Sequence, residues 1–451
     1  MKNTPPVITR IAPSPTGAFH FGTARTALYN YLFAKKHGGT FMVRFEDTDS
    51  ERSDRSYESD ILQSLSWLNI SPDVITRQSE RRSVYRGHIN RLLASGHAYE
   101  SREPSKKDPS QEVVVIRYKN TERNVSFKDT VRGTITIDVS DLGDFVIARS
   151  IDDPLYNLAV AVDDCVMGIT HVLRGDDHIT NTPRQILLMQ ALGYQPPSYT
   201  HIPLIHGEGG GKLSKRKGAL SVLDFKRRGY VSGAVCNALF LLGWSPVDEQ
   251  EVFPLEDMVQ AFSLDRIQKK EALFREKKLA WFNRQYVQAL PEAAIRREVM
   301  PALLRRFPFR SLLNPRVLSS IVQGVREQGT LFADVRDRIQ SGDYDFFFIP
   351  PVYEPPLLIP DGEDQKQVRQ SLTRVQELLA TRSGYRGWDA VSTHELLLPY
   401  AEKEGKSLVF WPLRTALSGR EKSPSPFDIM EVIGKKQTMA RIQTALNLLR
   451  E

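Results

Sequence analysis

Four consecutive residues near the N-terminus, His20-Phe21-Gly22-Thr23, have the types needed to hold a chain of phosphates. They stand where a loop is expected to enter a helix, and the N–H groups and positive dipole of a helix N-terminus attract anions. Gly22 lets a ligand approach the backbone closely, and the His20 imidazole can donate a hydrogen bond to phosphate oxygens as charge develops. Taken alone, the tetrapeptide is better interpreted as a helix-capping loop with an incidental histidine.

A second cluster lies near the middle of the chain, where residues 209–218 have the sequence GGGKLSKRKG. Its glycines permit many backbone conformations and its lysines make it cationic. Lys212 and Lys215 could therefore neutralise charge that develops on a pyrophosphate leaving group. A solvated basic surface loop or a localisation-like patch is the alternative, because basic runs of this length are often no more than that.

The N-terminal elements expected from the sequence form a βαβ unit. An apolar strand at 7–11 is followed by a loop, 12–17, whose prolines and glycine prevent regular structure. Apolar residues at helical spacing over 22–36 and a glycine pair at 38–39 predict a helix and its end. A strand at 40–45 completes the unit, which predicts two parallel strands with a right-handed crossover.

The same pattern recurs further along the chain. A strand is expected near Val172, with Thr182-Pro183 as N-cap and first helical residue of a helix that Gly193 ends. The apolar segment 201–205, just before the second cluster, looks like a further strand. The two patterns together predict two Rossmann-like halves of one parallel sheet.

Outside these halves the pattern changes twice. Alternation over 113–147 predicts a small β-rich insertion, whereas the chain beyond about 290 shows helical periodicity, including a cap at Asn314-Pro315 and a helix at 427–433. The fold class expected is therefore α/β: a Rossmann-like split parallel sheet with a small α+β insertion, followed by an all-α C-terminal region.

The composition is that of an ordinary globular protein of about three packed units. Hydrophobic residues make up 41% and charged residues 25% of the 451 residues, which disfavours disorder and membrane spanning. The N-terminus has no signal-peptide pattern, and the two cysteines form neither a thiolate metal motif nor a disulfide framework, so a reducing cytoplasm fits best. The net charge of +7 suits a polyanionic partner but is weak evidence alone.

In their order, separation and placement on two halves of one sheet, the two clusters resemble the signature motifs of class I aminoacyl-tRNA synthetases. The segment 20–23 resembles the HIGH element and 212–216 the KMSKS element. Thr23 and Arg216 depart from the general pattern, and both departures are usual in bacterial-type glutamyl-tRNA synthetases. Other segments that resemble that family are 10–17, 44–49, 174–178, 278–283 and 411–420.

The resemblance implies ATP-dependent ligation of L-glutamate to the 3′ end of tRNA-Glu through a glutamyl-adenylate, with release of AMP and diphosphate. It implies ATP with Mg²⁺, a monomer, and no membrane partner. Whether tRNA-Gln is charged instead or in addition stays open. The implied regions are 1–95 and 151–235 for the two catalytic halves, 96–150 for a shortened acceptor-end insertion, 236–290 for stem contact and 291–451 for anticodon binding.

An acidic amino acid carries two carboxylates and one ammonium, so its pocket needs a planar cationic fork and a carboxylate. Arg10 and Glu46 have these types, and the resemblance pairs Arg10 with the substrate's side-chain carboxylate and Glu46 with its α-ammonium. A structural ion pair is the alternative for either residue. The resemblance assigns glutamate binding to Arg10, Ala12, Ser14, Glu46, Tyr156 and Arg174.

The implied chemistry requires no protein nucleophile, so positioning and electrostatics carry it. The resemblance assigns catalysis to His20, Gly22, Thr23, Lys212, Ser214 and Lys215. It assigns ATP binding to Pro13, Ser14, Gly17, His20, Gly22, Lys212, Leu213, Ser214, Lys215, Asp177 and His178. No protein-bound metal is expected, because the insertion has no cysteines for the zinc that some relatives hold there.

Three rivals to this hypothesis can be weighed on the sequence. A glutaminyl-tRNA synthetase shares the catalytic architecture but ends in β-barrels, whereas this C-terminal region has helical periodicity. A short enzyme that glutamylates queuosine in tRNA lacks an anticodon-binding module, so the residues after 290 argue against it. A tRNA-binding paralogue without chemistry is disfavoured because His20, Lys212 and Lys215 are all present.

Overall fold

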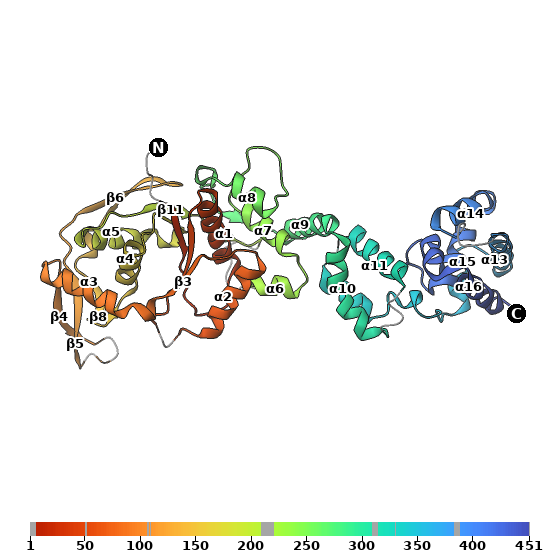
Figure 1. The fold of residues 1–451 in the computed structure, drawn as a ribbon, viewed down its shortest axis with the longest axis horizontal. Helices are drawn as coiled ribbons and strands as arrows, with labels where there is room; N and C mark the ends of the chain where they lie inside the picture. Colours follow the sequence, from red (N-terminus) through yellow and green to blue (C-terminus); the bar gives the residue numbers. More distant parts are fainter. Residues whose placement is uncertain are drawn as a thin grey trace. The chain divides into compact units, whose positions relative to one another are not determined.

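The computed structural model describes residues 6–49, 52–105, 108, 110–208, 221–308, 314–329, 331–382 and 388–450. The chain folds as two compact units, Met1–Asn283 and Arg284–Glu451. Strands and helices alternate in the first unit, while the described residues of the second form helices and no strand (Figure 1). This is the α/β class with an all-α C-terminal region that the sequence predicts. Within the described residues, no helix combines the length and apolar character needed to cross a membrane.

Three parallel strands in the order β1-β2-β3 form the first half of the sheet. Their bounds are Ile8–Ile11, Thr40–Phe45 and Val74–Arg77, and the crossovers are α1 (Phe21–Lys36) and α2 (Arg55–Trp67). The predicted βαβ unit is thereby confirmed. The turn after α1 needs glycine, since Gly38 has a φ of +62° and a Cβ on Gly39 would collide with the Val7 carbonyl oxygen.

The second half has the strand order β10-β11-β6-β7. β10 (His171–Gly175) and β11 (Ser198–Ile202) are parallel, and a 3₁₀ turn (Asp176–Asn181) and α5 (Thr182–Ala191) connect them. The halves meet where the Thr170 N–H donates to the Ile8 carbonyl (3.0 Å). Further along, the Asn30 amide of α1 donates to the Leu173 carbonyl (3.0 Å), so a side chain takes an acceptor that a neighbouring strand would otherwise use.

Two local predictions in this half need correction. The strand expected at 201–205 lies at Ser198–Ile202, because Pro203 has no N–H to continue the ladder. Thr182 was expected to cap α5, but it is the first residue of the helix, and its hydroxyl accepts a hydrogen bond from Arg174 Nη2 (2.6 Å) instead.

The insertion contributes to two sheets. β4 (Ala98–Pro104), β5 (Glu112–Tyr118), β8 (Phe145–Ser150) and β9 (Asp153–Pro154) form an antiparallel sheet of their own. β6 (Asn124–Asp129) and β7 (Gly133–Asp138) form a hairpin that extends the second half of the main sheet through a parallel contact between β6 and β11. One buried apolar cluster joins this region to α3 (Arg82–Ala94), α4 (Tyr156–Val166) and α5.

The remainder of the first unit is mainly helical. Its elements are β12 (Ile205–His206), α6 (Val222–Arg227), α7 (Ser232–Leu241), α8 (Leu255–Ala261), β13 (Ala272–Leu273) and the first part of α9 (Glu276–Ala289). The α6 N-terminus is a capping box, in which Ser221 and Asp224 satisfy each other's backbone N–H groups.

The second unit consists of packed helices. Their bounds are Glu292–Arg306 (α10), Pro315–Gln328 (α11), Phe332–Gln340 (α12), Gln365–Ala380 (α13), Ala390–Glu404 (α14), Lys406–Ser418 (α15) and Pro426–Leu448 (α16). Asn314 caps α11 as predicted, since its side chain accepts from the Arg316 N–H. Gly434, with φ +76°, divides α16 after the helix expected at 427–433.

Candidate active site

A cleft of about 520 Å³ opens at the carboxyl ends of β1, β2 and β10, where the two halves of the sheet meet. Ligands of open α/β sheets bind at this kind of crevice. Every predicted site residue that the structure describes lines it: Arg10, Ala12, Pro13, Ser14, Gly17, His20, Gly22, Thr23, Glu46, Tyr156, Arg174, Asp177 and His178. The predicted residues Lys212, Leu213, Ser214 and Lys215 lie outside the described residues.

One side of the cleft is the N-terminus of α1. His20 is its N-cap residue with an extended backbone, and no acidic side chain stands in the first turn. Apart from its chain neighbours and its own helix, no heavy atom of the described residues lies within 4 Å of the position that a Cβ would take on Gly22. The first-turn N–H groups therefore present a positive, uncrowded surface to the cleft.

Residues on both sides of the second cluster's sequence lie near this helix end. His20 forms a β-bridge with Ser221, the first described residue after that segment, and the Val222 N–H donates to the Phe19 carbonyl (3.0 Å). Ile205, which precedes the segment, lines the cleft. The described residues on both sides of segment 209–220 therefore lie at the cleft.

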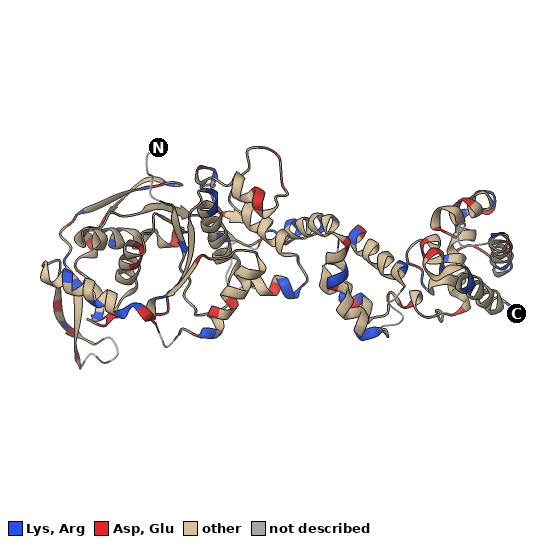
Figure 2. Ribbon diagram, viewed as in Figure 1, with Lys and Arg blue, Asp and Glu red and all other residues tan. Residues whose placement is uncertain are grey.

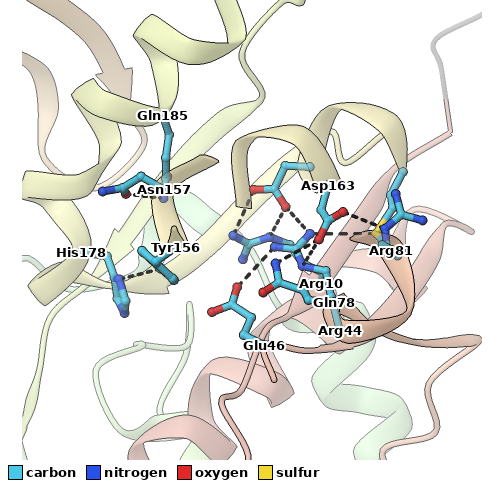
Figure 3. Close-up of polar contacts among 12 residues, drawn as sticks. Arg10, Arg44, Glu46, Gln78, Arg81, Tyr156, Asn157, Asp163, His178 and Gln185 are labelled. Carbon is cyan, nitrogen blue, oxygen red and sulfur yellow. Dashed lines mark hydrogen bonds and ion pairs between the residues drawn. The ribbon is translucent and has the colours of Figure 1, made fainter. Parts of the chain in front are cut away.

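Arg10, which lines the cleft, belongs to a group of buried ion pairs. Arg10 donates from Nε and Nη2 to the two oxygens of Asp164 (3.1 and 3.2 Å), and Arg44 Nη1 donates to Asp164 Oδ1 (2.6 Å). Burial would raise the pKa of Asp164, but the two guanidinium groups lower it to about 2. Figure 3 shows Arg10 and Arg44 converging on the end of α4, with Arg81 reaching Asp163 from the other side (2.7 Å).

Glu46 follows β2 directly and lines the cleft above these pairs. The residue is 8% exposed, and its ion-pair partner is Arg44 Nη2 at 3.5 Å. Burial raises the pKa of Glu46 to about 7, although Arg44 and Arg10 act in the opposite direction. A cation that bound beside Glu46 would favour its ionised form.

Tyr156 and His178 form a neutral pair on the opposite wall. The Tyr156 hydroxyl lies 3.1 Å from His178 Nδ1 (Figure 3). Burial, reinforced by Arg174, lowers the pKa of His178 to about 4, so the imidazole is neutral at neutral pH. The pair can therefore offer hydrogen bonds to a ligand without adding a charge.

Arg174 differs from Arg10 in having no carboxylate partner among the described residues. Its Nε donates to His201 Nε2 (3.3 Å), its Nη2 donates to the Thr182 hydroxyl, and its Nη1 is buried without a partner. The residue is 6% exposed and lines the cleft. Arg174 thus places an uncompensated positive charge where an anionic group of a ligand would satisfy it.

Arg44, Asp163 and Asp164 are buried beside the site but were not predicted as site residues from the sequence. Asp163 accepts from Arg81, from Gln78 (2.9 Å) and from the Tyr85 hydroxyl (2.8 Å), and it is fully buried. The signal that could have found this pair is two adjacent carboxylates within the otherwise apolar helix sequence YNLAVAVDDCV. Such residues are buried only when they have partners.

Two Rossmann-like half-sheets, with an anion-attracting helix end and buried arginines between them, place this chain among the α/β proteins whose crevice suits phosphates and other anions. A family model described as "tRNA synthetases class I (E and Q), catalytic domain" matches residues 6–112 and 100–281, and one described as "Anticodon binding domain" matches 294–446. The chain therefore belongs to the class I tRNA synthetase family of the E and Q type, which confirms the resemblance inferred from the motifs.

Similar proteins cover almost the whole chain. A glutamate–tRNA ligase of Aquifex aeolicus is 36% identical over 98% of this chain and 99% of its own length. Glutamate–tRNA ligase 1 of Alkalilimnicola ehrlichii is 38% identical over 97% of both chains. The crystal structure of a glutamate tRNA ligase from Elizabethkingia meningosepticum, in complex with its amino acid, superposes with a TM-score of 0.85 at 28% identity, covering 99% of this chain and 100% of that one.

Proposed function

We propose that this chain ligates L-glutamate to the 3′ end of tRNA-Glu in an ATP-dependent reaction. The observation that carries the proposal is the combination, in one cleft, of a helix N-terminus suited to phosphates with Arg174, Arg10 and Glu46, which suit an acidic amino acid. Relatives that span the same length are named glutamate–tRNA ligases, which supports glutamate as the amino acid.

We assign each of the three charged side chains to a different charged group of the amino acid. Arg174 offers the buried Nη1 that has no partner, so it suits a substrate carboxylate. Arg10 is held by Asp164 through Nε and Nη2, which fixes the plane of its guanidinium for the side-chain carboxylate. Glu46 takes the α-ammonium, and binding of that cation keeps Glu46 ionised. Tyr156, Ala12 and Ser14 complete the pocket.

ATP with Mg²⁺ is the second substrate. The uncrowded first turn of α1 at Gly22 and Thr23 fits the phosphates, and Pro13, Gly17, Asp177 and His178 line the adjoining wall. His20 donates to the α-phosphate region as charge develops. We assign Lys212, Leu213, Ser214 and Lys215 to the pyrophosphate leaving group. Ser221, which follows their segment in the sequence, forms a β-bridge with His20 at the end of the cleft assigned to the phosphates.

Two transfers complete the reaction. A carboxylate oxygen of glutamate attacks the α-phosphorus of ATP, a P–O bond to pyrophosphate breaks, and glutamyl-adenylate forms. A ribose hydroxyl of the terminal adenosine then attacks the activated carbonyl, its proton leaves, and AMP departs with the bonding electrons. Neither step needs a covalent enzyme intermediate, so positioning and electrostatic stabilisation supply the catalysis.

The remaining regions are assigned to the tRNA. The insertion 96–150 would hold the acceptor end, 236–290 the stem and 291–451 the anticodon, and an anticodon-binding family model over 294–446 supports the last of these. Basic side chains recur along α10, which carries Arg296, Arg297, Arg305 and Arg306 (Figure 2). Such rows attract a phosphate backbone.

We assign the enzyme to the cytoplasm, acting as a monomer.

Charging of purified tRNA-Glu and tRNA-Gln, assayed separately with radiolabelled glutamate and ATP, tests the proposal. We expect label on tRNA-Glu and none on tRNA-Gln, and no label when ATP is omitted. Radiolabelled glutamine serves as the matched amino-acid control and should not be transferred. Label on tRNA-Gln would overturn the tRNA specificity, and absence of label on both tRNAs would overturn the function.

A further inference from the structure

Arg174 is oriented by a hydrogen-bonded chain that begins in the insertion. Asp129, the last residue of β6, lies 2.8 Å through Oδ2 from His201 Nδ1, and it accepts the His201 backbone N–H at 2.8 Å. His201 Nε2 then accepts from Arg174 Nε (3.3 Å). Asp129 is 1% exposed and His201 is 0% exposed, so these hydrogen bonds are shielded from water.

The directions of these bonds fix the state of the imidazole. Burial lowers the pKa of His201, so the ring is neutral and carries one proton. Burial would raise the pKa of Asp129, but hydrogen bonds from His201 and from the Arg132 N–H lower it below its ordinary value. An ionised Asp129 can only accept, so the proton of His201 stays on Nδ1, and Nε2 is left as an acceptor for Arg174.

The same carboxylate organises the turn that follows β6. Asp129 Oδ1 accepts from the N–H groups of Val131 (2.9 Å) and Arg132 (2.7 Å). The Arg132 side chain in turn donates to Asp176 Oδ2 (2.7 Å), in the 3₁₀ turn that contains Asp177 and His178. One turn of the insertion is therefore tied to two neighbouring parts of the cleft wall.

We propose that Asp129 and His201 are positioning residues for Arg174, through which the β6–β7 hairpin of the insertion sets the geometry of the glutamate pocket. The inference rests on the proposed function, because Arg174 is taken to bind a substrate carboxylate. His201 accepts from Arg174 Nε, and the Thr182 hydroxyl, which itself lies 3.0 Å from His201 Nε2, accepts from Nη2; Nη1 is the guanidinium nitrogen left without a partner among the described residues. An arginine that lacks a carboxylate partner in the free protein needs such a neutral acceptor to keep one orientation.

Two substitutions of His201 distinguish its hydrogen bond to Asp129 from its hydrogen bond to Arg174. His201→Asn keeps an amide N–H near the Nδ1 position, toward Asp129, but offers Arg174 no acceptor. His201→Gln keeps an acceptor near the Nε2 position, toward Arg174, and loses the link to Asp129. Each is measured by tRNA-Glu charging over a range of glutamate concentrations, then of ATP concentrations, alongside the melting temperature.

We expect His201→Asn to raise KM for glutamate about tenfold, as for one lost hydrogen bond to a charged group, with KM for ATP unchanged. His201→Gln should stay within about threefold of the unsubstituted enzyme, because the acceptor for Arg174 is kept. A purely structural role would instead lower kcat or the melting temperature of both variants and leave both KM values in place. That result overturns the inference.

A matched pair in the insertion tests the other end. Asp129→Asn replaces one accepting oxygen with a donor and should raise KM for glutamate in the same way. Asp138→Asn makes the same chemical change at an exposed residue of β7 and should leave KM unchanged. Equal KM values in both variants, with normal charging, overturn the inference alone. Failure of the unsubstituted protein to charge tRNA-Glu overturns the proposed function as well. If Asp129→Asn does not fold, the two His201 variants decide the question.

Discussion

Replacing Glu46 with glutamine is expected to stabilise the first unit while weakening glutamate binding. The pKa of Glu46 rises from an ordinary 4.5 to about 7 in the folded protein. A carboxyl group whose folded pKa is raised contributes stability below its unfolded pKa, and this contribution is lost as pH rises through the folded pKa. The difference between 4.5 and 7 corresponds to about 3 kcal/mol of unfolding free energy at pH 8. Glutamine is neutral at all these pH values and escapes that loss.

Melting temperatures at pH 5 and pH 8 measure this effect. At pH 8 the Glu46→Gln variant should melt about 6 °C above the unsubstituted protein, and at pH 5, just above the unfolded pKa, the difference should fall to about a quarter of that. Glu249→Gln, at an exposed loop residue, is the control and should show no such pH-dependent gain. A Glu46→Gln variant that is less stable than the unsubstituted protein at pH 8 would refute the raised pKa.

The same carboxylate should control the pH dependence of substrate binding. Because Glu46 must be ionised to receive the ammonium, KM for glutamate in the unsubstituted enzyme should be about tenfold higher at pH 6 than at pH 8. In the Glu46→Gln variant KM should be high and nearly independent of pH over this range. A variant that kept the original KM would show that Glu46 does not bind the ammonium group.

Two further substitutions test separate parts of the chain. Gly22→Ala would place a methyl group in the open space of the cleft, so KM for ATP should rise about tenfold or more. The melting temperature should not fall, because alanine favours the helix. An unchanged KM for ATP would contradict the placement of the nucleotide. Asn314→Ala removes the cap of α11 and should cost about 1 kcal/mol of unfolding free energy, which lowers the melting temperature of the second unit by about 3 °C. Neither KM should change. An unchanged melting temperature would show that the cap contributes nothing to stability.

Elements that depend on local pattern could be predicted from the sequence, while residues that depend on distant partners could not. The first strand, α1 and β2 lie within a residue or so of their expected positions, because periodicity and glycine ends are local signals. The strand expected at 201–205 was displaced because a run of apolar residues does not reveal where proline breaks the ladder. Thr182 fits the capping pattern locally, yet Arg174 from the preceding strand uses its hydroxyl.

The buried charges of the cleft also depend on partners that are distant in the sequence. Arg10 and Asp164 are 154 residues apart, and Asp129 and His201 are 72 apart, so no window of sequence could pair them. Once paired, the cations at the cleft are not equivalent: Arg10 is compensated before any ligand arrives, whereas Arg174 is not. A buried charge left without a partner costs about 3 to 5 kcal/mol, and only an anion can relieve it. Any amino acid meets this requirement of Arg174 through its α-carboxylate, so the preference for glutamate over glutamine is expected to rest on Arg10, which is assigned to the side-chain carboxylate.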